Sequence, residues 1–164
     1  MSSYADFFRR SIDDRDGFWG EQSQLIDWHK PFDQVCDYSN PPFARWFAGG
    51  QTNLCHNAVD RHLATRGDQN ALIFVSTETN IEKAYSFKEL HAEVQRMAAI
   101  LKDLGVKKGD RVLIYMPMIA EACFAMLACV RIGAIHSVVF GGFASHALAS
   151  RIEDATPTLI ISAD

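Results

Sequence analysis

Residues 111–164 read RVLIYMPMIAEACFAMLACVRIGAIHSVVFGGFASHALASRIEDATPTLIISAD, and this stretch decides the fold. Short apolar runs rich in Val and Ile alternate here with two longer helical patterns. Such runs, each bounded by turn residues, are typical of strands buried on both faces of a parallel sheet. We therefore predict an α/β fold with a parallel βαβαβ unit, whose strands are Arg111–Met116, Ile135–Phe140 and Leu159–Ser162.

The first connecting helix, 118–132, is apolar almost all round. Its two charges, Glu121 and Arg131, lie at the ends that suit the helix dipole. Pro117 is expected to start the helix, and Gly133 can adopt the left-handed conformation that ends it. A helix of this kind needs cover on every side, which indicates a partner beyond these residues.

The second connecting helix, 145–155, is amphipathic and is predicted to lie on the surface of the sheet. Ser145 is its expected N-cap, and Pro157 prevents its continuation. Its apolar face is predicted to contain Leu148, Ala149, Ile152 and Ala155.

The first fifty residues show weaker patterns. Residues 4–28 favour one or two short amphipathic helices interrupted near Gly17 and Gly20. Residues 30–43 are rich in Pro, Asp and Asn, which is typical of a connector with turns. Residues 45–48 are compatible with a short strand.

A helix is predicted over 54–65, with Asn53 as its cap and Gly67 at its end. Cys55, His56 and His62 lie on or beside it, so a metal site must be considered. No C-x-x-C or H-x-x-x-H pair completes a tetrahedral ligand set, and packed or solvated histidines are favoured.

A hairpin and a long helix are predicted next. Residues 71–76 and 83–87 resemble two strands joined by a polar loop around Thr79 and Asn80. Ser86 and Glu89 have the spacing of a capping box. The helix that follows is expected to end at Gly105. Its apolar positions are Leu90, Val94, Met97, Ala98, Leu101 and Leu104.

Composition restricts the possible functions. The 48% apolar and 22% charged residues are ordinary for a globular protein, and the net charge of −4 with no basic aromatic stretch argues against nucleic-acid binding. The first ten residues lack the apolar core of a secretory signal, so we expect the cytoplasm, without membrane binding. The spacing of Cys36, Cys55, Cys123 and Cys129 indicates reduced thiols rather than a disulfide scaffold.

Few motifs in the chain indicate chemistry. G-x-G-x-x-G, G-x-x-x-x-G-K-S/T, G-x-S-x-G and H-E-x-x-H are all absent from the sequence. His136 and Ser137 are expected to be polar residues of the core. The turn Phe140-Gly141-Gly142-Phe143 follows a strand, where ligands bind in open α/β sheets. Its glycines either let a ligand approach the backbone or serve only a tight turn, which the local sequence favours.

A family resemblance adds to this interpretation. Residues 111–164 resemble the acetyl-CoA synthetase group of acyl-adenylate-forming enzymes, which carry a similar YMPM, LAC-x-RIGA-x-HSVVFGGF and RI-x-D. Residues 41–62, PPFARWFAGGQTNLCHNAVDRH, resemble propionate–CoA ligases more closely than acetate ligases.

The resemblance implies a two-step activation of a short-chain carboxylate such as propionate. The carboxylate attacks the α-phosphate of Mg-ATP, giving an acyl-adenylate and pyrophosphate, and the thiol of coenzyme A then takes the acyl group and releases AMP. ATP, coenzyme A and Mg²⁺ are the implied cofactors of the full-length enzyme, and the carboxylic acid is its partner.

The family's Ser/Thr/Gly-rich phosphate loop, acidic ribose-binding segment and catalytic lysine do not occur in these residues. We therefore expect an N-terminal fragment that is inactive alone, with no catalytic or metal-binding residue and with the rest of its own chain as partner. Residues 1–50 would be a helical and aromatic extension with a connector. Residues 51–164 would be the first, incomplete part of the AMP-binding domain.

The resemblance assigns one ligand contact to this chain. Phe140, Gly141 and Gly142 match the turn past which the pantetheine arm of coenzyme A runs, which favours the ligand interpretation of the glycine pair.

Three alternatives remain open. The chain could come from an acetate–CoA ligase, since the residues that size the acyl pocket lie outside it. It could be a free-standing α/β module that binds a nucleotide or coenzyme A, or an interaction segment whose apolar faces bind a partner.

Overall fold

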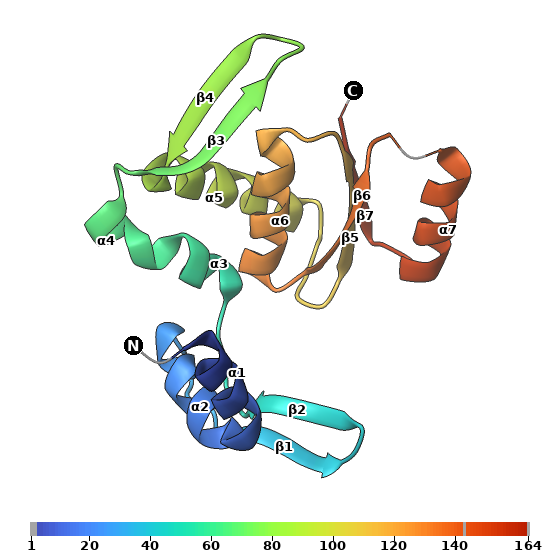
Figure 1. The fold of residues 1–164 in the computed structure, drawn as a ribbon. Coiled ribbons are helices and arrows are strands. Elements are labelled where there is room, and N and C mark those ends of the chain that lie inside the picture. The colour runs from blue at the N-terminus through green and yellow to red at the C-terminus, as the bar shows by residue number, and fades with distance from the viewer. Residues whose placement is uncertain (1–2, 143, 164) are drawn as a thin grey trace. The chain divides into compact units, whose positions relative to one another are not determined.

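The computed structural model describes residues 3–142 and 144–163. The chain divides into two compact units, Met1–Asn53 and Leu54–Asp164, and each is described by itself. Figure 1 shows the path of the chain.

The second unit contains the predicted parallel sheet. The strands β5 (Arg111–Met116), β6 (Ile135–Phe140) and β7 (Leu159–Ser162) pair in the order β6-β5-β7, and both pairings are parallel. The predicted bounds of all three strands are confirmed. Their carboxyl ends meet at one edge, because all three strands run in the same direction.

Two helices connect these strands, α6 (Ala120–Ile132) and α7 (Ser145–Ala155). They lie on opposite faces of the sheet, and α5 (Phe87–Asp103) packs beside α6 (Figure 1). The core lies between the α6 face of the sheet and these two helices. Its fully buried side chains include Val94, Leu101, Val112, Ile114, Ala125, Ala128 and Cys129.

Helix α6 starts later than predicted. Its N-cap is Ile119 in an extended conformation, and the Ile119 amide donates to the Pro117 carbonyl over 2.9 Å. Pro117 therefore belongs to a turn that precedes the helix. The predicted C-cap is confirmed, since Gly133 has a φ of +76°. This conformation strains any residue with a side chain.

The expected all-round burial of α6 is only partly realised. One side is buried in the core, whereas Cys123, Met126, Leu127 and Val130 are half-buried. These four residues line an apolar pocket of about 540 Å³, together with residues of α3, β3, α5 and β6.

Helix α7 has the predicted bounds, but two details differ. Its N-cap is Ala144, which has no side-chain oxygen, and Ser145 is already the first helical residue. Ala149 is exposed, whereas Ala147 is half-buried. The apolar face is thus rotated slightly from the predicted one, and it contains Ala147, Leu148, Ile152 and Ala155.

The hairpin and the capping box are confirmed. Strands β3 (Asn70–Ser76) and β4 (Ile81–Ser86) pair antiparallel. The Glu89 amide donates to Ser86 Oγ over 3.2 Å, and the Ser86 amide donates to Glu89 Oε2 over 2.8 Å. Leu104 was wrongly placed on the apolar face, because it follows the last turn of α5 and is 61% exposed.

The helix predicted over 54–65 is broken into three pieces. These are α3 (Leu54–Ala58), a 3₁₀ turn (Asp60–His62) and α4 (Leu63–Arg66). The break lies at Val59, which has φ −128° and ψ −63° and is 1% exposed. Gly67 keeps a right-handed conformation, so it does not end α4 in the predicted way.

The first unit contains two helices, α1 (Tyr4–Asp13) and α2 (Arg15–Gln22), followed by a 3₁₀ turn (Ser23–Leu25). The helices separate at Asp14, not at the glycines, because both Gly17 and Gly20 lie inside α2. A β-carbon at Gly20 would lie 3.4 Å from the side chain of Val35 on β1, which is an ordinary packing distance.

The predicted connector over 30–43 contains a strand that the sequence interpretation missed. This is β1 (Gln34–Asn40), which pairs antiparallel with β2 (Phe43–Ala48), the predicted short strand. The turn residues in this segment concealed β1, since its regular backbone comes from pairing with β2. Within the residues described, no helix combines the length and apolarity needed to cross a bilayer.

Candidate functional site

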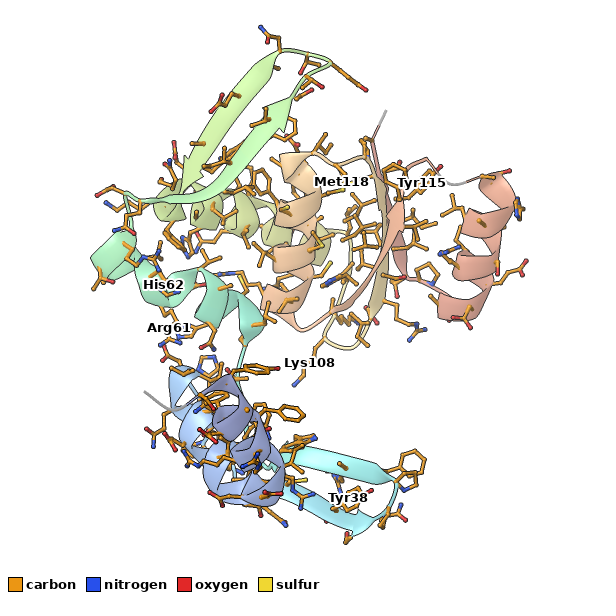
Figure 2. All side chains as sticks on the ribbon, in the orientation of Figure 1. Tyr38, Arg61, His62, Lys108, Tyr115 and Met118 are labelled. Carbon is orange, nitrogen blue, oxygen red and sulfur yellow. The ribbon has the colours of Figure 1, made fainter. Side chains whose placement is uncertain are left out.

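The carboxyl edge of the parallel sheet is formed by adjacent strand ends. Met116 at the end of β5 lies opposite Phe140 at the end of β6, and Tyr115 lies opposite Ser162 near the end of β7. Tyr115 and Met118, which are labelled in Figure 2, lie near this edge of the sheet. In open α/β sheets ligands bind beyond this edge.

Gly141 is held close to the neighbouring strand end. Its amide donates to the Met116 carbonyl over 3.1 Å. A β-carbon at this position would lie 3.1 Å from the carbonyl carbon of Met116 and 3.1 Å from the nitrogen of Pro117. Both contacts are with backbone, which cannot move as a side chain can. Packing against this backbone therefore disfavours a side chain at Gly141, which agrees with the tight-turn interpretation of the glycine pair.

The remaining residues of the turn face outward. The ring of Phe140 is 53% exposed, and Gly142 is exposed. A β-carbon at Gly142 would meet the Phe140 ring at 2.6 Å, so this glycine leaves room for the ring beside the turn. Phe143 lies outside the described residues. The turn thus presents an aromatic ring and a stretch of backbone without a side chain.

Replacing Gly141 with alanine should lower the free energy of unfolding of the second unit by about 1 to 2 kcal/mol, because the new methyl group presses on fixed backbone. Thermal or urea denaturation followed by circular dichroism measures this. Gly142→Ala is the matched control, since the new β-carbon would meet ring atoms of the Phe140 side chain and not backbone. Equal losses in the two variants would contradict the assignment of the packing role to Gly141.

His136 and Ser137 do not form a nucleophile and base. They are neighbours on β6, so their side chains point to opposite faces of the sheet. Both are half-buried, as expected for polar residues near the core, and His136 lines the apolar pocket.

A polar cluster that the sequence interpretation missed joins four helical segments, α3, the 3₁₀ turn Asp60–His62, α5 and α6. Arg131 of α6 makes two hydrogen bonds of 2.8 Å to the two carboxylate oxygens of Asp60. His91 Nε2 of α5 lies 3.2 Å from Asp60 Oδ1 and 3.3 Å from Arg131 Nη2. Cys55 Sγ of α3 accepts from Arg131 Nη1 over 3.6 Å.

The pKa values of Asp60 and Arg131 are both shifted towards the charged forms that make up their ion pair. Partial burial alone would raise the pKa of Asp60, but the hydrogen bonds and charge of Arg131 outweigh it, so this pKa lies below its ordinary value. The hydrogen bond to Asp60 raises the pKa of Arg131. Arg131 lies in the last turn of α6, which ends shortly before β6 begins, so the cluster belongs to the amino edge, opposite the candidate site. We interpret it as structural.

The cysteines are free thiols. Burial raises the pKa of Cys55 and of Cys123, and it raises the pKa of Cys129 to about 11. These three thiols are therefore protonated at neutral pH and are poor nucleophiles.

The residues considered for a metal site are not brought together. The ring of His62 packs at 5.1 Å from the ring of Phe87. Among the residues that the structure describes, no three His, Cys, Asp or Glu side chains could jointly hold a metal ion.

Fold and site together define an open α/β unit with a glycine turn at the ligand-binding edge of its sheet. A family model described as "AMP-binding enzyme" matches residues 59–164, and one described as "Acetyl-coenzyme A synthetase N-terminus" matches residues 4–58. The chain belongs to the AMP-binding enzyme family. The family resemblance drawn from the sequence is confirmed.

Similar proteins agree with this assignment. The chain is 60% identical to the propionate–CoA ligase of Escherichia coli K12 over 99% of its residues, which is 26% of that relative. It is 53% identical to acetyl-coenzyme A synthetase 2 of Pseudomonas putida over 98% of its residues and 25% of that relative. The solved acetoacetyl-CoA synthetase from Streptomyces lividans matches with a TM-score of 0.91 and 30% identity, covering 99% of this chain and 25% of that one. The chain thus spans about a quarter of the length of these relatives.

Proposed function

We propose that these residues are the N-terminal part of a short-chain acyl-CoA synthetase that activates propionate. The whole enzyme would form propionyl-adenylate and pyrophosphate from propionate and ATP, and then transfer the propionyl group to coenzyme A with release of AMP. The observation that carries this proposal is the 60% identity to two propionate–CoA ligases, against 48–53% to six acetyl-coenzyme A synthetases. Acetate is the second candidate substrate.

The proposed domain organisation follows from the same relatives. Residues 1–50 would form an extension and connector, and residues 51–164 would begin the AMP-binding domain. The division of the chain after Asn53 supports this, as does the boundary between the two family models at residues 58 and 59.

We assign Phe140, Gly141 and Gly142 to the pantetheine arm of coenzyme A. The turn fits this ligand in chemistry, because the half-exposed Phe140 ring can pack on an apolar arm and Gly142 lets the arm approach the backbone. Contacts of this kind depend on shape and backbone, so the isolated turn should bind weakly.

ATP and Mg²⁺ would supply the adenylating chemistry in the whole enzyme, with the cation stabilising charge on the transferring phosphate. We assign no residue of this chain to either. We also propose that the enzyme works in the cytoplasm with a small carboxylic acid as its partner.

The reading frame beyond Asp164 provides the first test. Continuation into a Ser/Thr/Gly-rich loop ending in lysine, and later into a lysine-bearing terminal domain, would support the proposal. A stop codon directly after Asp164 would instead favour a free-standing binding module.

Activity provides the second test. The full-length protein should catalyse propionate-dependent exchange of pyrophosphate into ATP, with a higher kcat/KM for propionate than for acetate, whereas residues 1–164 alone should catalyse none. A preference for acetate would favour the second candidate substrate. Exchange by residues 1–164 alone would overturn the assignment as an incomplete domain.

A further inference from the structure

The residues of helix α7 are less deeply buried than those of helix α6. Throughout α7, all of which the structure describes, no residue is buried, whereas α6 on the other face of the sheet has six buried residues. Only one side of α7, including Leu148 and Ile152, is half-buried. Leu113 and Val139 are buried on the sheet face opposite α6, and the contacts at the ends of α7 act in addition to this packing.

The charges and the backbone conformation at the carboxyl end of α7 both destabilise the helix. Its last turn has no basic residue, and it carries Glu153 and Asp154 where the helix dipole is negative. The helix then stops at Thr156 with φ +42°, a left-handed conformation that residues other than glycine adopt reluctantly.

Arg111, the first residue of β5, compensates for each of these features. Its Nε donates to the Ala155 carbonyl, and its Nη2 donates to the Thr156 carbonyl over 3.2 Å and to Thr156 Oγ1 over 3.1 Å. Charge-assisted hydrogen bonds of this kind are stronger than neutral ones. The Arg111 carbonyl also accepts from the Thr158 amide over 2.8 Å, just before β7 begins.

The other end of α7 is connected to the last residue of the same strand. The turn before α7 is fixed by the hydrogen bond from Gly141 to the carbonyl of Met116. Strand β5 and helix α7 have similar lengths, because the six residues of β5 span about 20 Å and the eleven residues of α7 span about 17 Å. Thus β5 holds the segment that contains α7 at both ends, through Arg111 and through Met116.

We propose that Arg111 is a positioning residue for coenzyme A. By fixing the carboxyl end of α7, it restricts movement of the helix along β5, and it thereby restricts Gly142, the residue of the Phe140–Gly142 turn that follows the Gly141–Met116 hydrogen bond. This role rests on the proposed function of that turn. Arg111 lies at the amino edge of the sheet and does not contact the ligand itself.

The test compares Arg111→Ala with Arg151→Ala in the full-length protein. We refer to the hydrogen bonds from Arg111 to Ala155 and Thr156 as the clamp. Arg151 lies on α7 and donates to the Ala147 carbonyl, and it supplies none of the hydrogen bonds of the clamp. Arg111→Ala should raise amide hydrogen exchange in 145–156 about tenfold, without changing exchange in 120–132. It should also raise the KM for coenzyme A about three- to tenfold, while propionate-dependent pyrophosphate exchange stays at the wild-type rate. Arg111→Lys should restore part of both effects.

If amide hydrogen exchange in residues 145–156 were unchanged in Arg111→Ala, Arg111 would not hold the carboxyl end of α7. Faster amide hydrogen exchange with an unchanged KM for coenzyme A would overturn the positioning role. Equal losses in adenylate formation and in acyl transfer to coenzyme A would also overturn it, because they indicate general destabilisation. If the wild-type protein lacks propionate-dependent exchange, the proposed function fails and the coenzyme A role falls with it. Hydrogen exchange separates that outcome from failure of the clamp.

Discussion

Replacing Ile114 with alanine should lower the free energy of unfolding of the second unit by about 2 to 5 kcal/mol. Ile114 is fully buried on the central strand β5, between Val138 of β6 and Ile161 of β7. Alanine removes three buried carbon atoms and leaves a cavity, which strands paired on both sides cannot easily fill. The loss should therefore lie in the range measured for large-to-small changes in cores.

Circular dichroism, or hydrogen exchange of residues 111–132, should be used to follow unfolding of the second unit. Tryptophan fluorescence is unsuitable, because Trp19, Trp28 and Trp46 all lie in the first unit. Ile73→Ala is a matched control, since Ile73 is 58% exposed on β3 and its loss should cost about 0.5 kcal/mol or less. A similar loss in both variants would argue that β5 is not at the centre of the core.

Replacing Asp60 with asparagine should lower the free energy of unfolding by about 2 to 3 kcal/mol at pH 7. The change keeps the size of the side chain but leaves the guanidinium of Arg131 without its counter-charge. Both side chains keep 20–25% exposure, so the loss should be smaller than for a fully buried pair. Asp68→Asn is the control, because the Lys88–Asp68 pair is 60% and 88% exposed and should contribute about 0.5 kcal/mol or less.

The pH dependence of this difference has a definite sign. The pKa of Asp60 is lower in the folded state, so its stabilisation is present above the ordinary carboxyl pKa of about 4 and is lost as the pH falls through the folded value. Stability measured from pH 7 down to pH 3 should therefore show wild type and Asp60→Asn converging at the acidic end. A constant difference over this range would show that the charge of Asp60 is not the cause.

The elements that were predicted correctly are those with strong local patterns. The three parallel strands, the Ser86–Glu89 capping box and the Gly133 helix end each depend on residues within a few positions of one another. The missed strand β1 and the break at Val59 depend on distant partners. The β1 backbone is regular because β2 pairs with it, and the helix from Leu54 breaks where Asp60 binds Arg131, which is 71 residues away.

The features of the candidate site also fall into those that local sequence predicts and those that depend on distant residues. The position of the Phe140–Gly142 turn at the carboxyl edge followed from the order of strands and helices. The backbone of Met116 and Pro117 against Gly141 could not be predicted, because it arises only when β5 and β6 pair in register. The bonds from Arg111 to the end of α7 were missed for a similar reason, since 44 and 45 residues separate the partners.

By itself, the sequence determined the α/β class, the three parallel strands and the place of the glycine turn at the end of β6, because apolar periodicity and glycine placement act over short distances. Only the tertiary structure decided which charges meet, where helices break and which glycine is required by packing. Those features depend on residues far apart in the chain, and each forms only when the fold brings the partners within contact or hydrogen-bond distance.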